Sequence, residues 1–520
     1  MTLEIYDTTL RDGSQQEGIS LTVGDKLRIA GLLDDLGVHY VEGGWPGANP
    51  KDDEFFRRAR SELNLSRATL VAFGSTRRPR GTVQDDAQLA ALLAAETETI
   101  CIVGKSWDYH VREALRADLD EGSRMVAESV AYLRSHDRRV FFDAEHFFDG
   151  YRDNPDFALT TLRVALEEGA ERVVLCDTNG GTLPHEILET VGAVQQTLPG
   201  AQIGVHFHND AGTAVASSLA SIRAGVRQVQ GCINGYGERT GNTDLSTLIP
   251  DLVLKEGLAV LPEGNLEMLG RISHHVAEIV NITLDPHRPY VGASAFTHKA
   301  GLHTSALARK PDAYEHTNPA LVGNTTRMVV SELAGRASIS SKADELGLDM
   351  DDALAQEVIE SVKEREHLGY HYEAADGSFE LLVRKLAGWE QKYFELESFR
   401  VFTERRASEE VVAEATVKVI VDGERVVTTG EGVGPVHALD QALRTALRRR
   451  FPQVMDLRLT DYRVRVLDSS DGTEATVRVL LETSDHETSW GTIGVHENVI
   501  EASWEALTEG LIIGILRHSS

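Results

Sequence analysis

The feature that most constrains the fold is one rhythm that repeats through the first 255 residues. A short apolar run rich in β-branched residues is followed each time by a polar turn and then by a stretch with helical periodicity. Eight runs have the character of strands: Leu3–Tyr6, Tyr40–Gly43, Ala68–Phe73, Thr99–Val103, Arg139–Ala144, Arg172–Asp177, Gln202–Phe207 and Gln228–Ile233. Eight strand–helix units of about 30 residues predict an α/β fold, a (β/α)8 TIM barrel. A doubly wound open sheet is the alternative, which fits the unbroken count of eight less well.

The first intervening helix shows the pattern clearly. Within Asp25–Leu36, apolar residues recur from Leu27 onward at the spacing of one helix face. Thr22 precedes Asp25 by three residues and resembles a capping box in which aspartate replaces the usual glutamate. We therefore expect a helix to begin just after Thr22.

Beyond Lys255 the strand–helix rhythm stops, and the pattern becomes mostly helical as far as residue 390. From about Ser398 it turns β-rich. We expect three parts: a catalytic TIM barrel over 1–270, a helical linker region over 271–397, and a C-terminal α+β regulatory domain over 398–520.

The C-terminal part contains an internal repeat. Glu414-Ala-Thr-Val417 recurs as Glu474-Ala-Thr-Val477, an offset of 60 residues. Each copy has strands, a glycine-containing turn and a helix, so two βα repeats are expected to pack together. Glycines such as Gly430, Gly432, Gly434, Gly491 and Gly494 either let the backbone approach an amino-acid ligand closely or simply turn the chain into the two helices.

Composition excludes several classes of protein. The 81 acidic residues outnumber the 52 basic ones, which gives a net charge of −29 and a surface that repels nucleic acid. No apolar run approaches the roughly 20 residues of a membrane helix, and Met1–Tyr6 enters a strand pattern without room for a signal peptide. Cys101, Cys176 and Cys232 lie in apolar runs typical of reduced core thiols. We expect a cytoplasmic, multidomain protein.

Polar and ionisable residues follow five of the predicted strands. In a TIM barrel the functional groups collect where strands end, so these segments should meet at one rim. The segments are Asp7–Gly13, Asp143–His146, Asp177–Gly181, His206–Asp210 and Gly235–Asn242.

The most specific pair in this set is His206 and His208. Two residues apart on a strand, they point to the same face. Asp12 follows the first strand, which neighbours the eighth in a closed barrel. Two histidines and a carboxylate suit a divalent metal such as Mn²⁺, Zn²⁺ or Mg²⁺ that keeps open positions for substrate oxygens. The alternative is a hydrogen-bonded network at the rim.

Two further residues are candidates for chemistry. Arg11 either stabilises an anionic group or closes the barrel through a structural salt bridge. Glu145 is a candidate base or base-orienting residue. The glycine-rich segment 235–242 is either a phosphate site or a tight turn. Residue patterns alone therefore predict a metal-dependent barrel enzyme that acts on a small anion.

Three motifs in this order resemble one family. They are Asp-Thr-Thr-Leu-Arg-Asp-Gly at 7–13, His-x-His-Asn-Asp at 206–210 and Gly-x-Gly-Glu-Arg-x-Gly-Asn at 235–242. The family is that of the metal-dependent TIM-barrel enzymes that include 2-isopropylmalate, homocitrate and citramalate synthases and hydroxymethylglutaryl-CoA lyase. The C-terminal repeat resembles the regulatory domain of isopropylmalate and citramalate synthases, which the lyases lack.

Within this family, Arg11–Gly18 and Gly43–Gly47 resemble the branch of citramalate synthases. Gly301–Ser305 matches the position of a catalytic histidine, here His303, although many isopropylmalate synthases read His-Gln-Asp-Gly there. Tyr314 matches a tyrosine near the active site of relatives.

The resemblance implies a Claisen-type condensation of acetyl-CoA with pyruvate and water, which yields (R)-citramalate and CoA for isoleucine biosynthesis. It implies a divalent metal, Mn²⁺, Mg²⁺ or Zn²⁺, and a homodimer in which His303 comes from the other subunit. The implied roles are metal ligation by Asp12, His206 and His208, with Asn242 a fourth ligand or a neighbour of the ligands, substrate binding by Arg11 and Thr178, and catalysis by Arg11, Glu145, His303 and Tyr314.

Two other functions remain open. A 2-isopropylmalate synthase, which condenses acetyl-CoA with 2-oxoisovalerate, shares every metal-site residue. An amino-acid-sensing regulatory protein with an inactive barrel is the alternative from another class, and the intact polar set argues against it. The expected feedback inhibitor is isoleucine for the first reading and leucine for isopropylmalate synthase.

Overall fold

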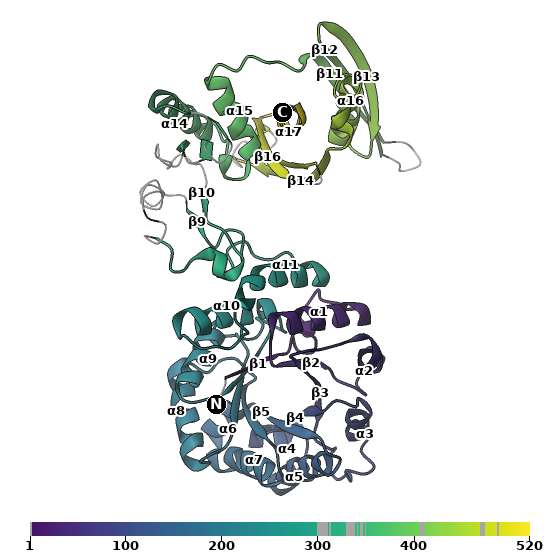
Figure 1. Ribbon diagram of the computed structural model, residues 1–520. Coiled ribbons are helices and arrows are strands. Elements are labelled where there is room, and N and C mark those ends of the chain that lie inside the picture. The colour runs from purple at the N-terminus through teal and green to yellow at the C-terminus, as the bar shows by residue number, and fades with distance from the viewer. Residues whose placement is uncertain are drawn as a thin grey trace. The chain divides into compact units, whose positions relative to one another are not determined.

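The computed structural model describes residues 3–298, 310, 314–328, 339–340, 342–343, 347–348, 350–405, 411–467, 474–485 and 488–519 (Figure 1). The chain divides into two compact units. The first comprises Met1–Phe296 with Thr317–Thr325, and the second comprises Thr297–His316 with Thr326–Ser520.

The first unit is a closed barrel of eight parallel strands, which confirms the TIM barrel and excludes the open sheet. Strand β1 pairs with both β2 and β8, so the sheet has no free edge. The strands are β1 Glu4–Asp7, β2 Tyr40–Gly44, β3 Thr69–Ser75, β4 Thr99–Lys105, β5 Arg139–Glu145, β6 Arg172–Asp177, β7 Ile203–Phe207 and β8 Gln228–Gly231.

Helices surround the barrel and bury their apolar faces against it (Figure 1). They are α1 Val23–Leu36, α2 Pro50–Glu62, α3 Ala87–Ala94, α4 Asp108–Glu113, α5 Leu119–Ser135, α6 Phe147–Asp153, α7 Pro155–Glu167, α8 Pro184–Thr197, α9 Ala214–Arg223, α10 Leu245–Pro250 and α11 Leu269–Val280. Short 3-10 or π turns are η1 Gly13–Gln15, η2 Ile233–Gly235, η3 Asp251–Lys255, η4 Asn265–Met268 and η6 Pro319–Val322.

The predicted capping box at the start of α1 is confirmed. The Thr22 hydroxyl accepts a hydrogen bond from the Asp25 N–H, and the Asp25 carboxylate accepts one from the Thr22 N–H. At the other end Gly37 adopts a left-handed conformation with φ of 95°, the usual helix stop.

An apolar layer fills the middle of the barrel. It consists of inward side chains of consecutive strands: Tyr6, Tyr40, Val71, Phe73, Cys101 and Phe141. At the amino-terminal end of the strands, Arg172 forms a 2.7 Å ion pair with Glu4. The polar residues at the carboxyl end of the strands therefore lie next to a packed apolar layer, which excludes water from the barrel interior on that side.

The second unit begins with a two-stranded sheet, continues with helices and ends with two similar sheet-and-helix halves. Its elements are β9 Thr297–His298, β10 Arg327–Met328, α14 Asp352–His367, η7 Tyr372–Ala374, α15 Asp376–Leu386, β11 Glu395–Arg405, β12 Val411–Val421, β13 Glu424–Gly432, α16 Pro435–Leu447, η8 Pro452–Met455, β14 Arg458–Val466, β15 Val477–Ser484, β16 Ser489–His496 and α17 Val499–Ser519. Across the described residues of both units, no helix is long and apolar enough to cross a bilayer.

Each half is a three-stranded antiparallel sheet packed on one helix, which confirms the two βα repeats. The register of the repeat differs from the expectation. The Thr428 hydroxyl donates to the Ala442 carbonyl at 2.8 Å, and Thr492 donates to Ala506 at 2.7 Å, both 64 residues further on. The offset of 60 is therefore wrong. The tetrapeptide at 414–417 lies inside β12, whereas its second copy begins before β15.

Glycines in these sheets let the helices pack closely. A Cβ on Gly430 would stand 2.5 Å from the Ala442 nitrogen, and one on Gly494 would stand 1.9 Å from the Ala502 oxygen. A Cβ on Gly491 would stand 1.9 Å from the Ala374 oxygen. The protein's own backbone occupies the space that was expected to serve a ligand or a turn at these three positions.

Candidate active site and metal centre

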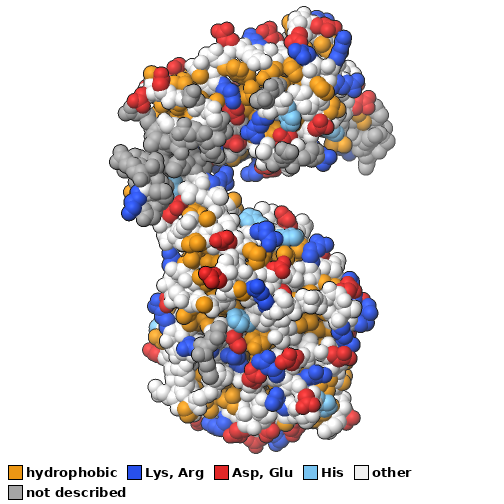
Figure 2. Space-filling model, viewed as in Figure 1, with side chains coloured by type: hydrophobic (Ala, Val, Ile, Leu, Met, Phe, Trp, Pro, Cys, Tyr) orange, Lys and Arg blue, Asp and Glu red, His pale blue; other side chains and the backbone are white. Residues whose placement is uncertain are grey.

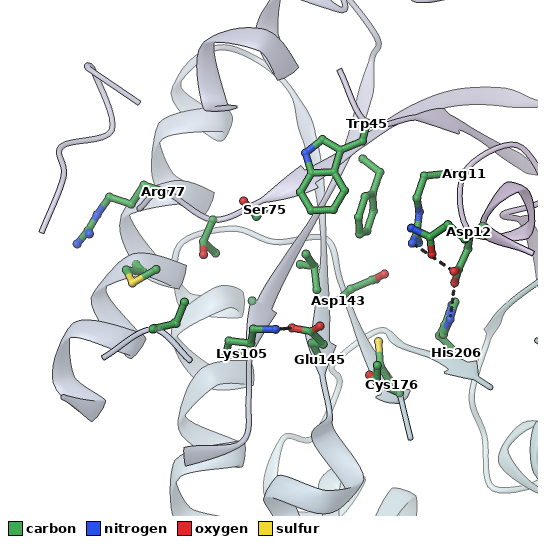
Figure 3. A pocket seen from close by; sticks show the side chains of 18 of the residues that line it. Arg11, Asp12, Trp45, Ser75, Arg77, Lys105, Asp143, Glu145, Cys176 and His206 are labelled. Atoms are coloured by element: carbon green, nitrogen blue, oxygen red, sulfur yellow. Dashed lines mark ion pairs between the residues drawn. The ribbon is translucent and has the colours of Figure 1, made fainter. Parts of the chain in front are cut away.

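A cavity of about 470 Å³ opens at the carboxyl end of the barrel strands (Figure 3). Its lining includes side chains from the loop after β1, from β3 to β5, and from the segments that follow β6 and β7. Six candidates from the sequence line it: Arg11, Asp12, Glu145, Thr178, His206 and His208. On the face of the molecule that Figure 2 shows, Lys and Arg side chains are interspersed with Asp and Glu side chains.

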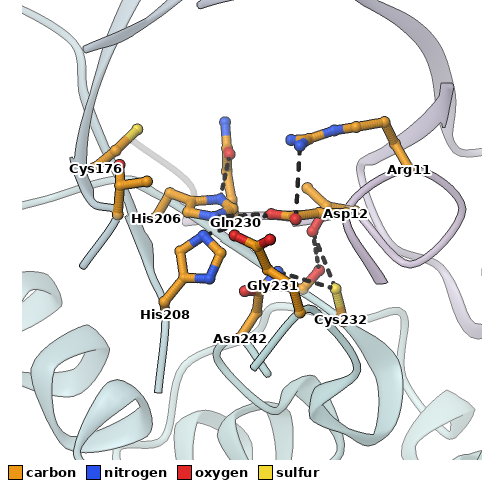
Figure 4. Close-up of polar contacts among 12 residues, drawn as sticks. Arg11, Asp12, Cys176, His206, His208, Gln230, Gly231, Cys232 and Asn242 are labelled. Carbon is orange, nitrogen blue, oxygen red and sulfur yellow. Dashed lines mark hydrogen bonds and ion pairs between the residues drawn. The ribbon is translucent and has the colours of Figure 1, made fainter. Parts of the chain in front are cut away.

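Asp12, His206 and His208 come together at the inner end of this cavity (Figure 4). One ligand atom from each lies within 4.8 Å of the others, and all three side chains are buried. The Asp12 Oδ2 atom is 3.1 Å from His206 Nε2 and 3.9 Å from His208 Nε2. The spacing argument therefore placed these three residues correctly.

A chain of hydrogen bonds orients the His206 ring. Its Nδ1 lies 2.9 Å from the amide oxygen of Gln230, and the Gln230 amide nitrogen donates to Asp143 at 3.0 Å. Because the Gln230 oxygen can only accept, Nδ1 carries the proton and Nε2 is directed toward Asp12. A cation and a proton thus compete for the same Nε2 lone pair.

The charges within the group suit a cation. Burial raises the pKa of Asp12, but the Arg11 guanidinium and the hydrogen bond with His206 outweigh it and hold this pKa well below its usual range. Burial lowers the pKa of His206, and its contact with Asp12 reverses the effect and raises it overall. Burial and the neighbouring His206 lower the pKa of His208 to about 3. Asp12 is therefore an anion and His208 a neutral base.

Unpaired polar atoms show that hydrogen bonding alone does not satisfy the site. His208 Nδ1 and Asn242 Oδ1 are buried without a hydrogen-bond partner among the described residues. Asn242 is held beside His208 by an isolated β-bridge. Its amide nitrogen lies 3.5 Å from Cys232 Sγ, and a Cβ on Gly237 would stand 3.0 Å from the amide. Two imidazoles, a carboxylate and a free amide oxygen fit a divalent cation.

Arg11 lies beside the group and faces the cavity. Its Nε donates to Glu42 at 2.6 Å, its Nη1 is 3.7 Å from Asp12, and its guanidinium lies 3.8 Å above the ring of Phe73. Tyr6 donates to the other Glu42 oxygen at 2.6 Å. The guanidinium is thus fixed in place with part of its surface toward the cavity. The expected structural salt bridge of Arg11 is present, and its role toward an anionic group stays a prediction.

On the opposite wall, Glu145 forms an ion pair with Lys105 (Figure 3). The two residues are register partners at the ends of β4 and β5. Thr178, which follows β6, accepts a hydrogen bond from the His146 N–H at 3.0 Å through its hydroxyl oxygen. Lys105 was not anticipated, and it is the cation closest to the candidate base.

His303 lies outside the described residues. Tyr314 belongs to the second unit and is about half exposed, and its expected role near the barrel remains a prediction.

Glu42, Gln230 and Lys105 are site residues that sequence reasoning missed, and Asp143 was noted only as part of the polar segment that follows the fifth strand. Each is a polar residue at an inward position of a barrel strand, in step with the inward Tyr40, Phe141, Gln228 or Val103 two residues earlier. Period-two alternation with a polar residue facing the barrel interior is the signal that finds them.

Three family models match successive parts of the chain. The HMGL-like family matches residues 2–276, the homocitrate synthase post-HMGL domain-like family matches residues 290–368, and the LeuA allosteric (dimerisation) domain matches residues 373–512.

Curated relatives are similar over the whole length. An (R)-citramalate synthase of Streptomyces coelicolor is 54% identical over 99% of this chain and 97% of its own length. The (R)-citramalate synthase of Aquifex aeolicus is 50% identical over 99% of this chain and 98% of its own length. A probable 2-isopropylmalate synthase of Methanopyrus kandleri is 32% identical over 98% of this chain and 97% of its own length.

Proposed function

This chain belongs to the (R)-citramalate synthase family of HMGL-like enzymes, and from that premise we infer that it condenses acetyl-CoA with pyruvate and water to form (R)-citramalate and CoA. Identity of 50% or more to two citramalate synthases, against 32% to a probable 2-isopropylmalate synthase, favours pyruvate over 2-oxoisovalerate.

The observation that carries this proposal is the buried group of Asp12, His206 and His208 beside Arg11 in one cavity. A 2-oxo acid presents a carboxylate next to a ketone oxygen. A divalent cation held by these three residues, with Asn242 adjacent, would supply Lewis acidity toward a bound 2-oxo acid. The unpaired Asn242 and His208 atoms support the assignment of this set as the metal site.

The remaining roles concern protein groups alone. Glu145, with His303, takes a proton from the methyl group of acetyl-CoA, and the released electron pair forms the bond to the ketone carbon of pyruvate. Negative charge then develops on the former ketone oxygen, and Arg11 is placed to stabilise it. Thr178 binds the substrate carboxylate, and Tyr314 assists. Hydrolysis of the citramalyl thioester releases CoA.

We further propose that the chain forms a homodimer and that isoleucine inhibits it through the C-terminal domain. The match to the LeuA allosteric (dimerisation) domain supports both statements. If the product leads to isoleucine, an inhibitor with that side chain need not resemble either substrate, because it binds elsewhere.

The function is tested by product analysis. Purified protein is incubated with a divalent cation, pyruvate and acetyl-CoA labelled with ¹³C at the methyl carbon. We expect labelled (R)-citramalate and one equivalent of CoA, identified by NMR and chiral chromatography. Label that stays in acetyl-CoA, or appears only in acetate, contradicts the proposal.

A further inference from the structure

The ion pair of Lys105 and Glu145 has a placement that sets it apart from the structural salt bridges of the barrel. The two side chains are the last residues of neighbouring strands and line the cavity that contains Asp12 and His206 (Figure 3). They are 27% and 23% exposed, so the pair is open to the space where substrate would lie.

Other charged or titratable groups near the pair make contacts of their own with residues other than Lys105 and Glu145. His110 of α4 and His146 lie with their rings 4.3 Å apart. Asp149 of α6 is 3.6 Å from His146 Nδ1 and accepts a hydrogen bond from Asn179 at 2.8 Å. Arg77 lines the same cavity but pairs with Glu121 at 2.8 Å. Lys105 is therefore the cation in direct contact with Glu145 among the described residues.

Stability does not account for this pair. Partly exposed ion pairs contribute little to the stability of a fold, because solvent screens them. By comparison, the Lys26–Asp52 pair is nearly inaccessible, and Lys26 also donates to the Gly43 carbonyl at 3.0 Å, which ties α1 to β2 and α2. The Lys105–Glu145 pair joins two strands that the barrel already holds in register.

We propose that Lys105 is a positioning residue that holds the Glu145 carboxylate in one orientation, directed into the cavity, for removal of the acetyl methyl proton. The inference rests on the function proposed above. In that step the methyl C–H bond breaks, its proton goes to a Glu145 oxygen, and its electron pair forms the new carbon–carbon bond to the ketone. An ion pair with a neighbouring strand residue limits the orientations of the carboxylate, and proton transfer requires one of them.

The experiment compares Lys105→Met, Lys105→Arg, Glu145→Gln and the double variant Lys105→Met/Glu145→Gln in the full-length enzyme. Readouts are kcat, the KM for pyruvate, and exchange of acetyl-CoA methyl protons with D₂O. Arg58→Met is the matched control, because it breaks a partly exposed ion pair, with Glu62 on α2, that does not line the cavity.

We expect Lys105→Met to lower kcat by about 10- to 100-fold, within the usual range for lost acid–base assistance, with little change in KM for pyruvate. Methyl exchange should slow in parallel. Lys105→Arg should restore most of the activity. Arg58→Met should keep the wild-type kcat and exchange rate.

The double variant is decisive, because a residue that acts through Glu145 adds nothing once Glu145 is gone. The double variant should therefore be no slower than Glu145→Gln. Multiplicative losses, or a Lys105→Met enzyme with wild-type kcat and methyl exchange, overturn the proposal. If Lys105→Met is poorly folded, Lys105→Gln replaces it. Wild-type enzyme that forms no citramalate contradicts the proposed function instead, so the two failures are distinguishable.

Discussion

At the scale of single residues, the strongest prediction concerns the cation site. His208→Ala should abolish turnover and release bound metal, because it removes one of three buried ligand side chains that act as a unit. Elemental analysis and activity assays after dialysis test this, with exposed His185→Ala of α8 as the control. Turnover that survives both the substitution and exhaustive chelation would contradict the metal assignment.

Side-chain alternation was enough to place His206 and His208 together, since both lie on one face at the end of β7. It was not enough for the groups that orient them. Gln230 matters because the register of β7 with β8 puts it opposite His206. Lys105 matters because β4 and β5 pair it with Glu145. Such relations depend on strand register, which a single sequence does not contain.

A second prediction concerns the wholly buried Asp7. Burial raises its pKa to about 7 from an ordinary value of 3.8, against the hydrogen bonds that it accepts from Thr9. The folded protein therefore binds this proton more tightly than the unfolded chain. Stability from this group is complete below about pH 4 and is lost as pH rises through about 7. Asp7→Asn removes the dependence.

The advantage of Asp7→Asn in free energy of unfolding should consequently grow by about 2–3 kcal/mol between pH 5 and pH 8. Thermal or denaturant unfolding of both proteins at several pH values measures it. Exposed Asp120→Asn should show a constant difference over the same range. A constant difference for Asp7→Asn as well would show that this carboxyl is ionised throughout.

At the scale of elements, the glycines of the C-terminal sheets carry a prediction. Gly494→Ala places a Cβ 1.9 Å from the Ala502 oxygen, so α17 must move away from β16. We expect Gly494→Ala to lower the free energy of unfolding by about 1–3 kcal/mol, as substitutions at other overpacked sites do. Gly434→Ala is the matched control, because nothing lies within 4 Å of its Cβ and its backbone is extended. Hydrogen exchange of the β15 and β16 amides measures the difference in local stability between the two variants. Equal protection in the two variants contradicts close packing as the reason for glycine.

Elements themselves were well predicted where β-branched runs alternate with amphipathic stretches. The ends of β4 and β5 were placed too early because Lys105 and Glu145 are polar, yet they continue the strands. The predicted offset of 60 residues between the two repeats was wrong for a related reason. Four identical residues recur by coincidence at a spacing of 60, whereas equivalent positions are defined by which strand residue faces which helix carbonyl.

At the scale of the whole molecule, we predict feedback inhibition of the enzyme through its C-terminal domain. Isoleucine should inhibit the full-length enzyme without competing with pyruvate, whereas leucine and valine should have little effect at the same concentration. Steady-state kinetics with each amino acid tests this. Inhibition by leucine alone contradicts both the regulatory assignment and the choice of pyruvate.

Periodicity and repeats predicted the barrel and the C-terminal βα repeats, but the role of His303 rests on resemblance alone. A residue that acts from another subunit leaves no mark in the pattern of the barrel it serves. Only assembly brings such a group to a site, so neither spacing nor burial within one chain identifies it.

The central claim is that this site condenses acetyl-CoA with pyruvate. The most direct measurement is CoA release by the purified full-length protein with a panel of 2-oxo acids: pyruvate, 2-oxobutanoate, 2-oxoisovalerate and 2-oxoglutarate. We predict that kcat/KM is highest for pyruvate, by at least about tenfold over the branched 2-oxoisovalerate, which is the scale on which an apolar pocket discriminates substrates that differ by one or two carbon atoms. A higher kcat/KM for 2-oxoisovalerate than for pyruvate contradicts the account.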